Sequence, residues 1–264
     1  MHNDDQPVGR VLSRREIMRV CGATSAAALA AGVATRAAAR PSASTAIDAV
    51  PDCIALPAQT EGPYFVDEQL KRSDIRLEPS TGRTSDGVPL DLTFHLTRVS
   101  DAGACAILPG AMVDIWHCDA QGVYSGVRDR GFDTTDQTFL RGYQVTDEQG
   151  VVRFRTIYPG WYAGRAVHVH FKVRVTTGAG RADEFTSQLY FDDGLTDRVH
   201  ANTPYASHKG QRLLNARDMI FREGGTRLVL PVAETAGGYV AAYRIAMRPG
   251  VPAPSFGRRG PRRS

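Results

Sequence analysis

A strictly alternating run between residues 167 and 175 constrains the fold of this chain more than any other stretch. Alternation with a period of two predicts a half-buried β-strand, because successive side chains of a strand point to opposite faces. His168 and His170 share one face, about 6 to 7 Å apart at roughly 3.3 Å per residue, so the two imidazoles can converge on one metal ion. The opposite face is apolar, so these are not ordinary core histidines. Val167, Val169, Phe171, Val173 and Val175 form the apolar face, and His168, His170, Lys172 and Arg174 form the polar face.

Turn residues divide the remaining sequence into short segments of similar character. Pro109-Gly110 and Pro159-Gly160 are two of these turns. One helix is predicted near Gln211–Phe221, ended by Gly224-Gly225. The pattern is typical of an all-β protein, a β-sandwich of mostly antiparallel strands with long loops and one or two short helices. Besides the alternating run, strands are predicted at 90–97, 111–118, 142–146, 151–157, 185–191, 227–232 and 239–246.

The first 39 residues have the character of an export signal. Ser13-Arg14-Arg15-Glu16-Ile17 resembles the twin-arginine motif, and a weakly apolar run follows from Val20 to Ala34. A run of about 15 apolar or small residues is shorter than the roughly 20 that a membrane span needs. The segment therefore predicts export by the twin-arginine translocation machinery, a periplasmic or secreted protein, and no stable membrane anchor. The alternative is a fraying helix on a cytoplasmic protein.

Composition and charge divide the chain further. Residues 40–50 are predicted to be a linker, 51–248 one sandwich domain, and 249–264 a disordered basic tail. The net charge of +4 comes from the ends, because residues 1–39 contribute +2 and the four arginines of the last seven residues contribute +4. The rest of the chain therefore carries −2. This nearly neutral body gives no argument for nucleic acid as a partner.

Cys53, Cys105 and Cys118 remain once the predicted signal is removed together with Cys21. An oxidising compartment favours disulfide formation. Cys105 and Cys118 are expected at opposite ends of one strand, too far apart to bridge. Pairing of Cys53 with either one stays open. No CxxC spacing indicates a zinc site.

Two tyrosines and an arginine give the histidine pair a chemical context. Tyr162 precedes His168 by six residues, across a glycine turn that can fold it back toward the strand, and Arg165 precedes it by three. Tyr124 follows a predicted strand end. Phenolate ligation requires a strong Lewis acid because the ordinary pKa of tyrosine is near 10, and Fe(III) is hard enough where softer divalent ions prefer nitrogen and sulfur. The alternatives are exposed histidines and packed tyrosines with hydrogen-bonded hydroxyls.

Five segments resemble, in order and spacing, those of the intradiol ring-cleavage dioxygenases, and most of all the catalytic-subunit type of protocatechuate 3,4-dioxygenase, in an exported single-chain branch. The resemblance spans residues 53 to about 245 and implies a β-sandwich with one non-haem Fe(III) per chain at its edge. The implied iron ligands are Tyr124, Tyr162, His168 and His170, with a solvent hydroxide as the fifth. The segments are Thr60-Glu-Gly-Pro-Tyr64, Asp114-Ile-Trp-His-Cys-Asp with Gly122-Val-Tyr124, Thr156-Ile-Tyr-Pro-Gly-Trp-Tyr162, Arg165-Ala-Val-His-Val-His-Phe171 and Ser187-Gln-Leu-Tyr-Phe191.

The same resemblance implies roles for the residues around the ligands. Arg165 is catalytic, a cation beside the substrate ring, and a fixed guanidinium does stabilise the negative charge that develops on a catecholate attacked by oxygen. Its alternative is a structural salt bridge with Asp183 or Glu184. Tyr162 is catalytic as the tyrosinate that the substrate displaces. The implied substrate-binding residues are Gln188 in the pocket and Thr60, Gly62, Pro63 and Tyr64 over its mouth, where the alternative is a plain turn.

The implied activity is the opening of a catechol-type ring between its two hydroxyls with O2, to a cis,cis-muconate-type product, in the catabolism of aromatic compounds. Ala163 and Ala166 stand where the family often has proline, a departure that removes no ligand, and His117 is not expected to be a ligand. Two alternatives are a non-catalytic transthyretin-like β-sandwich binding module and a cupin-like metalloenzyme with another ion at His168 and His170. The identity of the catechol and the formation of a homo-oligomer stay open.

Overall fold

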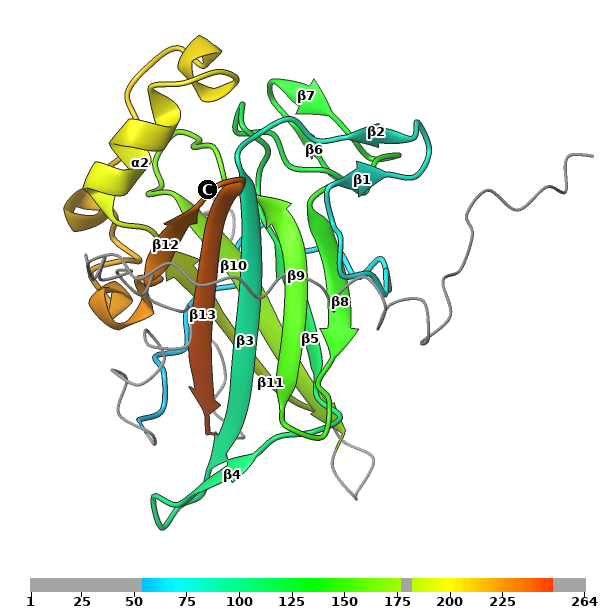
Figure 1. Ribbon diagram of the computed structural model, residues 1–264, viewed down its shortest axis with the longest axis vertical. Helices are drawn as coiled ribbons and strands as arrows, with labels where there is room; N and C mark the ends of the chain where they lie inside the picture. Colours follow the sequence, from blue (N-terminus) through cyan, green and yellow to red (C-terminus); the bar gives the residue numbers. More distant parts are fainter. Residues whose placement is uncertain (1–53, 177–181, 249–264) are drawn as a thin grey trace, which may run out of the picture. The chain divides into compact units, whose positions relative to one another are not determined.

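The computed structural model describes residues 54–176 and 182–248, which form two β-sheets packed face to face (Figure 1). This confirms the predicted all-β sandwich of mostly antiparallel strands. The predicted signal peptide at 1–39, the linker at 40–50 and the basic tail at 249–264 lie outside the described residues.

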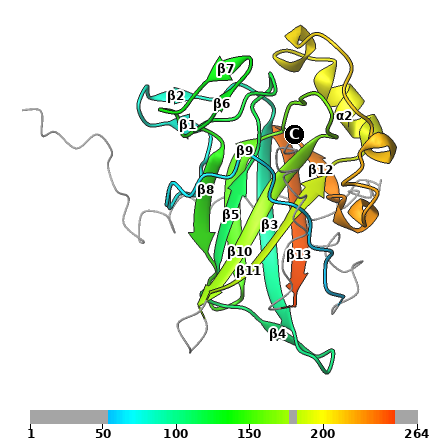
Figure 2. The ribbon, with the colours of Figure 1, turned by 180° about the vertical axis from the view of Figure 1, so that it is seen from behind.

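The first sheet contains the alternating run and has the strand order β11-β10-β5-β8, with every pair antiparallel (Figure 2). His170 of β10 lies opposite Trp116 of β5 and Gln188 of β11. Opposite residues of neighbouring strands share a face, so this register gathers the side chains of His170, Trp116 and Gln188 in one place. The strands are β5 (Met112–Trp116), β8 (Arg141–Val145), β10 (His168–Thr176) and β11 (Ala182–Tyr190).

The second sheet has the order β12-β13-β3-β4, with β9 paired to β3. Its strands β3 and β13 run parallel, and its other pairs are antiparallel. Two short hairpins, β1 (Leu77–Glu78) with β2 (Arg83–Thr84) and β6 (Arg128–Asp129) with β7 (Phe132–Asp133), lie outside the two sheets. The strands of the second sheet are β3 (Pro89–Val99), β4 (Cys105–Ile107), β9 (Val151–Ile157), β12 (Val232–Thr235) and β13 (Gly238–Met247).

The apolar face of β10 packs into the core between the two sheets. Val169, Phe171 and Val173 are fully buried, and the Phe171 ring lies 6.4 Å from that of Phe94 on β3. The polar face of β10 therefore points away from the core, as the alternation predicts.

That polar face is nevertheless covered, which the prediction of a half-buried strand did not anticipate. Residues 168–173 are all buried. Lys172 pairs with Glu61, and its ammonium lies 4.1 Å from the centre of the Phe65 ring. A buried lysine requires such a partner. The segment 59–65 thus lies over this face, a tertiary contact that a period of two does not reveal.

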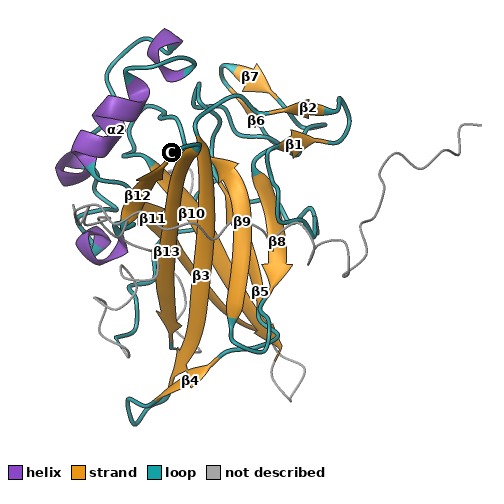
Figure 3. Ribbon diagram, viewed as in Figure 1, coloured by secondary structure: helices purple, strands orange, loops and turns teal. Residues whose placement is uncertain are grey.

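The predicted helix at 211–221 is wrong, and the one α-helix of the described residues is α2 (Asp193–His200) (Figure 3). Asp192 caps α2 by accepting a hydrogen bond from Leu195 N at 2.8 Å. Three 3₁₀ turns follow, η2 (Tyr205–Ser207), η3 (Asn215–Arg217) and η4 (Gly225–Leu228). The last of these replaces the start of the strand predicted at 227–232.

The cysteines also differ from expectation. Cys105 lies on β4 and is disulfide-bonded, whereas Cys118 follows β5 and is a buried free thiol. Cys105 and Cys118 therefore do not lie at the two ends of one strand, because Cys105 is within β4 and Cys118 lies two residues beyond the end of β5. Cys53 lies outside the described residues. Within 54–176 and 182–248, no helix has the length and apolar character needed to cross a membrane.

Candidate metal centre

His168 and His170 aim their Nε2 atoms at one point. The two atoms lie 2.9 Å apart, and both rings are buried. His168 Nδ1 lies 2.6 Å from the carbonyl oxygen of Ala166, which can only accept, so Nδ1 holds the proton and Nε2 of the neutral ring keeps a free lone pair. Burial lowers the pKa of both histidines well below the usual value, and the charge of Arg165 lowers it further. Two neutral imidazoles whose Nε2 atoms converge are suited to bind a metal.

Packing holds the ring of His170 in place. The indole of Trp116 stacks on it, with centroids 4.9 Å apart and planes within 4°. A Cβ added to Gly62 would lie 3.4 Å from His170 Cε1, and Gly62 has a positive φ of 74°. The glycine therefore allows the segment 59–65 to pass close to the imidazole.

Tyr162 reaches the histidines from the loop before β10. Its hydroxyl lies 3.4 Å from His168 Nε2. The loop turns at Gly164, whose φ of +87° permits the return that the sequence predicts. Burial raises the pKa of Tyr162 to about 12, and the positive charge of Arg165 opposes that rise.

Tyr124 enters from the loop after β5. Its ring centre lies 5.6 Å from that of Tyr162 and 6.4 Å from that of His170. The side chain is 1% exposed, and its hydroxyl has no hydrogen-bond partner. Burial raises the pKa of this phenol well above the usual value. An unpartnered buried hydroxyl costs about 1–3 kcal/mol, so a group that binds it there would stabilise the site.

The loops that carry the two tyrosines touch at Gly122. A Cβ added to this glycine would overlap the carbonyl oxygen of Trp161 and lie 3.1 Å from Cε1 of His208. The His208 ring in turn stacks on Trp161, with centroids 4.1 Å apart. This close backbone approach sets the separation of Tyr124 and Tyr162.

The four side chains fit a hard metal ion. Imidazole nitrogens lie about 2.0–2.1 Å from a bound metal such as zinc, so two adjacent ones are about 3 Å apart, close to the observed spacing of the Nε2 atoms. The described residues contain no group of three or more His, Cys, Asp or Glu that could hold a metal. The oxygen donors beside the histidines are instead phenols, which favour Fe(III) over a softer divalent ion.

Arg165 lies beside these donors and is held by a ring of partners. Its Nε donates to Asp218 Oδ2 at 3.0 Å, and its Nη2 donates to Gln188 Oε1 and, at 3.4 Å, to the hydroxyl of Tyr190. Burial alone would lower its pKa, but the nearby Tyr162 and Asp218 outweigh that effect and raise it. The guanidinium is therefore a permanent cation with a defined orientation. The alternative partners considered from the sequence are wrong, because Glu184 pairs with Lys172 and Asp183 with Arg98.

The four residues predicted over the mouth of the pocket make different contacts. Thr60 accepts a hydrogen bond from Gln188 Nε2 on its carbonyl at 2.8 Å, and Gly62 faces His170. The ring of Tyr64 stacks on that of Tyr124 at 4.4 Å, and its hydroxyl donates to Asp129 Oδ2 at 2.5 Å. Pro63 is exposed at the turn between them.

Comparison with known proteins decides the family. The profile of the Dioxygenase_C family, described as Dioxygenase, matches residues 60–230, which include all the residues predicted for the site. An intradiol ring-cleavage dioxygenase from Tetranychus urticae superposes with a TM-score of 0.63 at 29% identity, over 76% of this chain and 98% of that one.

The chain belongs to the intradiol ring-cleavage dioxygenase family.

Curated members of the intradiol dioxygenase family are also similar. A chlorocatechol 1,2-dioxygenase of Pseudomonas putida is 32% identical over 165 residues, and a protocatechuate 3,4-dioxygenase beta chain of Burkholderia cepacia is 31% identical over 155 residues. Each alignment covers 54% of this chain, and the chain spans 58% and 63% of the length of these two relatives. The family uses non-haem iron, which agrees with the chemistry of the four donors.

In this member of the family, both ring nitrogens of His117 are engaged away from the four donors. Its Nδ1 lies 2.8 Å from the carbonyl of Cys118 and its Nε2 lies 2.6 Å from the hydroxyl of Thr156. Burial lowers its pKa to about 4. Both ring nitrogens are occupied, as expected for a histidine that does not bind the metal.

Sequence reasoning missed Asp218, Tyr190 and Gln59. The Tyr190 hydroxyl donates to Gln59 Oε1 at 3.0 Å and lies 3.1 Å from Gln188 Oε1. Tyr190 has the same parity as Gln188 along β11, and this signal was available in the sequence. Asp218 lies 53 residues from Arg165, and no pattern joins them.

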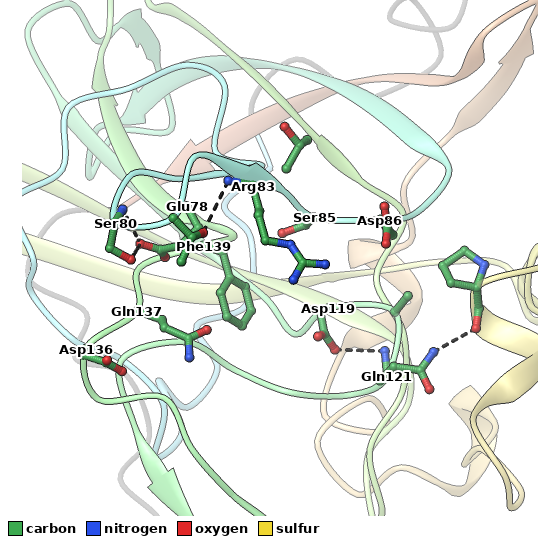
Figure 4. Close-up of a pocket in the computed structure, with 14 residues that line it drawn as sticks. Glu78, Ser80, Arg83, Ser85, Asp86, Asp119, Gln121, Asp136, Gln137 and Phe139 are labelled. Carbon is green, nitrogen blue, oxygen red and sulfur yellow. Dashed lines mark hydrogen bonds between the residues drawn. The ribbon is translucent and has the colours of Figure 1, made fainter.

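A separate cavity of about 460 Å³ lies beside the β1–β2 hairpin, and none of the predicted site residues lines it (Figure 4). Its carboxylates Glu78 and Asp119 accept hydrogen bonds from the backbone, Glu78 from Thr138 N at 2.5 Å and Asp119 from Gln121 N at 2.9 Å. These two groups are therefore used to hold loops.

Proposed function

We propose that this chain is a non-haem Fe(III) intradiol dioxygenase, which cleaves a catechol-type ring between its two hydroxyls with O2 and yields a cis,cis-muconate-type product. The observation that carries the proposal is the convergence of two neutral imidazoles and two phenols, one with an unpartnered hydroxyl, next to a buried guanidinium. The proposed ligands are Tyr124, Tyr162, His168 and His170, with one iron per chain. The family of the chain supports this activity.

When bound, Fe(III) supplies a Lewis acid that withdraws electron density from a chelated catecholate. Tyr162 is one of the residues that would hold the metal and is the proposed proton acceptor for the incoming catechol, because burial raises the pKa of its phenol to about 12, so the free hydroxyl would keep a proton. Arg165 faces the ring and stabilises the negative charge that develops on it. Gln188 orients that guanidinium, and the segment of Thr60, Gly62, Pro63 and Tyr64 limits access of water.

The proposed substrate class is a catechol, in the catabolism of aromatic compounds. Relatives named for chlorocatechol and for protocatechuate support the class. A panel of catechol, chlorocatechol, protocatechuate and hydroxyquinol, followed by oxygen uptake and product spectra, identifies the substrate.

The colour of the iron-loaded chain tests the metal assignment. Tyrosinate bound to Fe(III) absorbs visible light, so the protein is expected to be red-brown, and Tyr124→Phe and Tyr162→Phe are each expected to change the band and lower turnover. Tyr143→Phe, a change on β8 of the same sheet, is the matched control. A colourless protein that binds no iron would refute the proposal in favour of a binding module. A divalent metal without the band would favour another metalloenzyme.

We also propose that the chain is exported to the periplasm or the medium by the twin-arginine machinery. The Ser13–Ile17 motif supports this, as does the disulfide at Cys105, because disulfides persist in oxidising compartments. Replacing Arg14 and Arg15 by lysine is expected to retain the protein in the cytoplasm, as measured by cell fractionation. Unchanged export would contradict this route.

A further inference from the structure

Asp218 is a buried carboxylate whose two oxygens have separate partners. It is 1% exposed and lies just after η3. Oδ1 accepts hydrogen bonds from Ile220 N at 2.7 Å and Phe221 N at 3.3 Å. Oδ2 accepts from Arg165 Nε at 3.0 Å and from Ala166 N at 2.8 Å. One oxygen thus caps its own turn, and the other is committed to residues 165 and 166.

The contact with Nε determines how the guanidinium is oriented. A guanidinium is planar, so a bond at Nε on one edge and bonds at Nη2 define the plane. Gln188 and Tyr190 supply the contacts at Nη2. None of these three partners uses Nη1. The arginine therefore keeps one nitrogen for other contacts while the remainder is held.

The partners of Arg165 are themselves connected. Gln59 accepts from the Tyr190 hydroxyl on its Oε1, and its Nε2 donates to the carbonyl of Ile220 at 2.9 Å. Ile220 in turn donates its backbone N–H to Asp218. The hydrogen bonds therefore form a closed loop around the guanidinium, which joins the start of the 59–65 segment, the end of β11 and the turn at Asp218.

We propose that Asp218 is a positioning residue of Arg165, which together with Gln188 holds the guanidinium beside the substrate ring, and this inference rests on the proposed function. A cation lowers the barrier of a charge-developing step only if it is in place before the charge appears. A buried carboxylate that did no more than cap a turn would not need an oxygen directed at another loop. The position of that oxygen is thus explained by Arg165 and its neighbour.

The substitution Asp218→Asn separates the capping of the turn from the contact with Arg165. The amide oxygen can stay on the side of Ile220 and Phe221 and preserve the cap, but the NH2 group then faces the N–H groups of Arg165 and Ala166. Donors facing donors repel, so the guanidinium is expected to leave its position while the turn persists. Asp147→Asn is the matched control, because Asp147 caps the turn between β8 and β9 by accepting from Gln149 N at 3.0 Å and Val151 N at 2.8 Å.

The experiment uses the full iron-loaded chain. Asp218→Asn is expected to keep the visible band of the metal site and a KM within about threefold, and to lose about 10- to 100-fold in kcat, below the loss of 10²–10³ for removing a direct donor. Its crystal structure is expected to show Arg165 displaced and the two histidines unmoved. Asp147→Asn keeps the kcat of the unmodified chain. An unchanged kcat, or an Arg165 that stays in place, would overturn the inference.

A double-mutant comparison guards against a merely structural effect. If Asp218 acts through Arg165, adding Asp218→Asn to Arg165→Leu produces no further loss of kcat. A further loss of tenfold or more would show that Asp218 acts by another route and would overturn the inference. Should the unmodified chain cleave no catechol, the proposed function fails, and the displacement of Arg165 in the crystal still reports on positioning. If Asp218→Asn does not fold, the same structural comparison is made with Asp218→Glu. A guanidinium of Arg165 that moves with the longer carboxylate supports the inference, and a guanidinium that does not move overturns it.

Discussion

Gly122→Ala tests the idea that one close backbone contact sets the distance between the two tyrosine loops. Gly122 has a φ of +82°, where an L-residue costs about 1–2 kcal/mol. The new Cβ would also overlap the carbonyl oxygen of Trp161. A backbone atom cannot rotate away as a flexible side chain can, so the loops that carry Tyr124 and Tyr162 must separate.

The expected loss is the sum of two effects. The backbone strain contributes about 1–2 kcal/mol and the overpacking about 1–3 kcal/mol, so the free energy of unfolding falls by about 2–5 kcal/mol. Separation of the loops moves Tyr124 and Tyr162 apart, so the variant is also expected to bind iron weakly and to lose most of its visible band. Urea unfolding and titration with iron measure the two effects.

Two other glycines supply matched controls. Gly103 has a φ of +80° and Gly164 a φ of +87°, and a Cβ at either meets nothing within 4 Å. Gly103→Ala and Gly164→Ala should therefore lose only the backbone contribution, about 1–2 kcal/mol, and keep the band. Gly164→Ala is the sharper control because its loop also carries Tyr162. If all three variants lose the same stability and Gly122→Ala keeps its iron, the reasoning is refuted.

Further predictions concern His117, the iron and Lys172. The pKa of His117 is about 4 in the folded protein, against an ordinary value of 6.5. The contribution of neutral His117 to the free energy of unfolding is therefore fully present above pH 6.5 and is lost as the pH falls toward 4. His117→Gln should reduce the stability difference between pH 7 and pH 4, measured by urea unfolding, by about 3 kcal/mol, and an unchanged difference would contradict the assignment. Removal of iron by a chelator should bleach the band and lower the Tm, and a Tm unaffected by iron would count against the four proposed ligands. Lys172→Met should leave Glu61 without its buried partner and speed proteolysis within the 59–65 segment, whereas equal rates would show that the pair does not hold it.

The sequence predicts those parts of this fold that local patterns encode. Alternation located β10 and the direction in which His168 and His170 point, because the geometry of a strand is set by neighbouring residues. The glycine turn before β10 likewise anticipated the return of Tyr162. The ligand set was inferred from resemblance, since Tyr124 lies in a distant loop and spacing alone does not connect it to the strand.

The wrong and missing predictions have two origins, tertiary contacts and local signals that were not used. The helix expected at 211–221 does not form, because that segment is held by side chains instead, as where Asn215 Nδ2 donates to the carbonyl of Phe191 at 2.7 Å. Helix α2 was missed although Asp192 could cap it and Leu195 and Val199 have a spacing of four residues. Asp218 carried no signal at all, since its role depends on a partner brought near by folding.

The parallel pairing of β3 with β13 determines how late in synthesis the second sheet can be completed. Leu90 lies beside Tyr239, so one edge of β3 stays unpaired until nearly the whole described chain has been synthesised. At a synthesis rate of about 5–20 residues per second, the time between the synthesis of Leu90 and that of Tyr239 is about 7 to 30 s. An open strand edge is a template for aggregation, and the proposed export signal is synthesised before that interval begins. A transport route that accepts folded proteins would suit a sheet completed by its last strand.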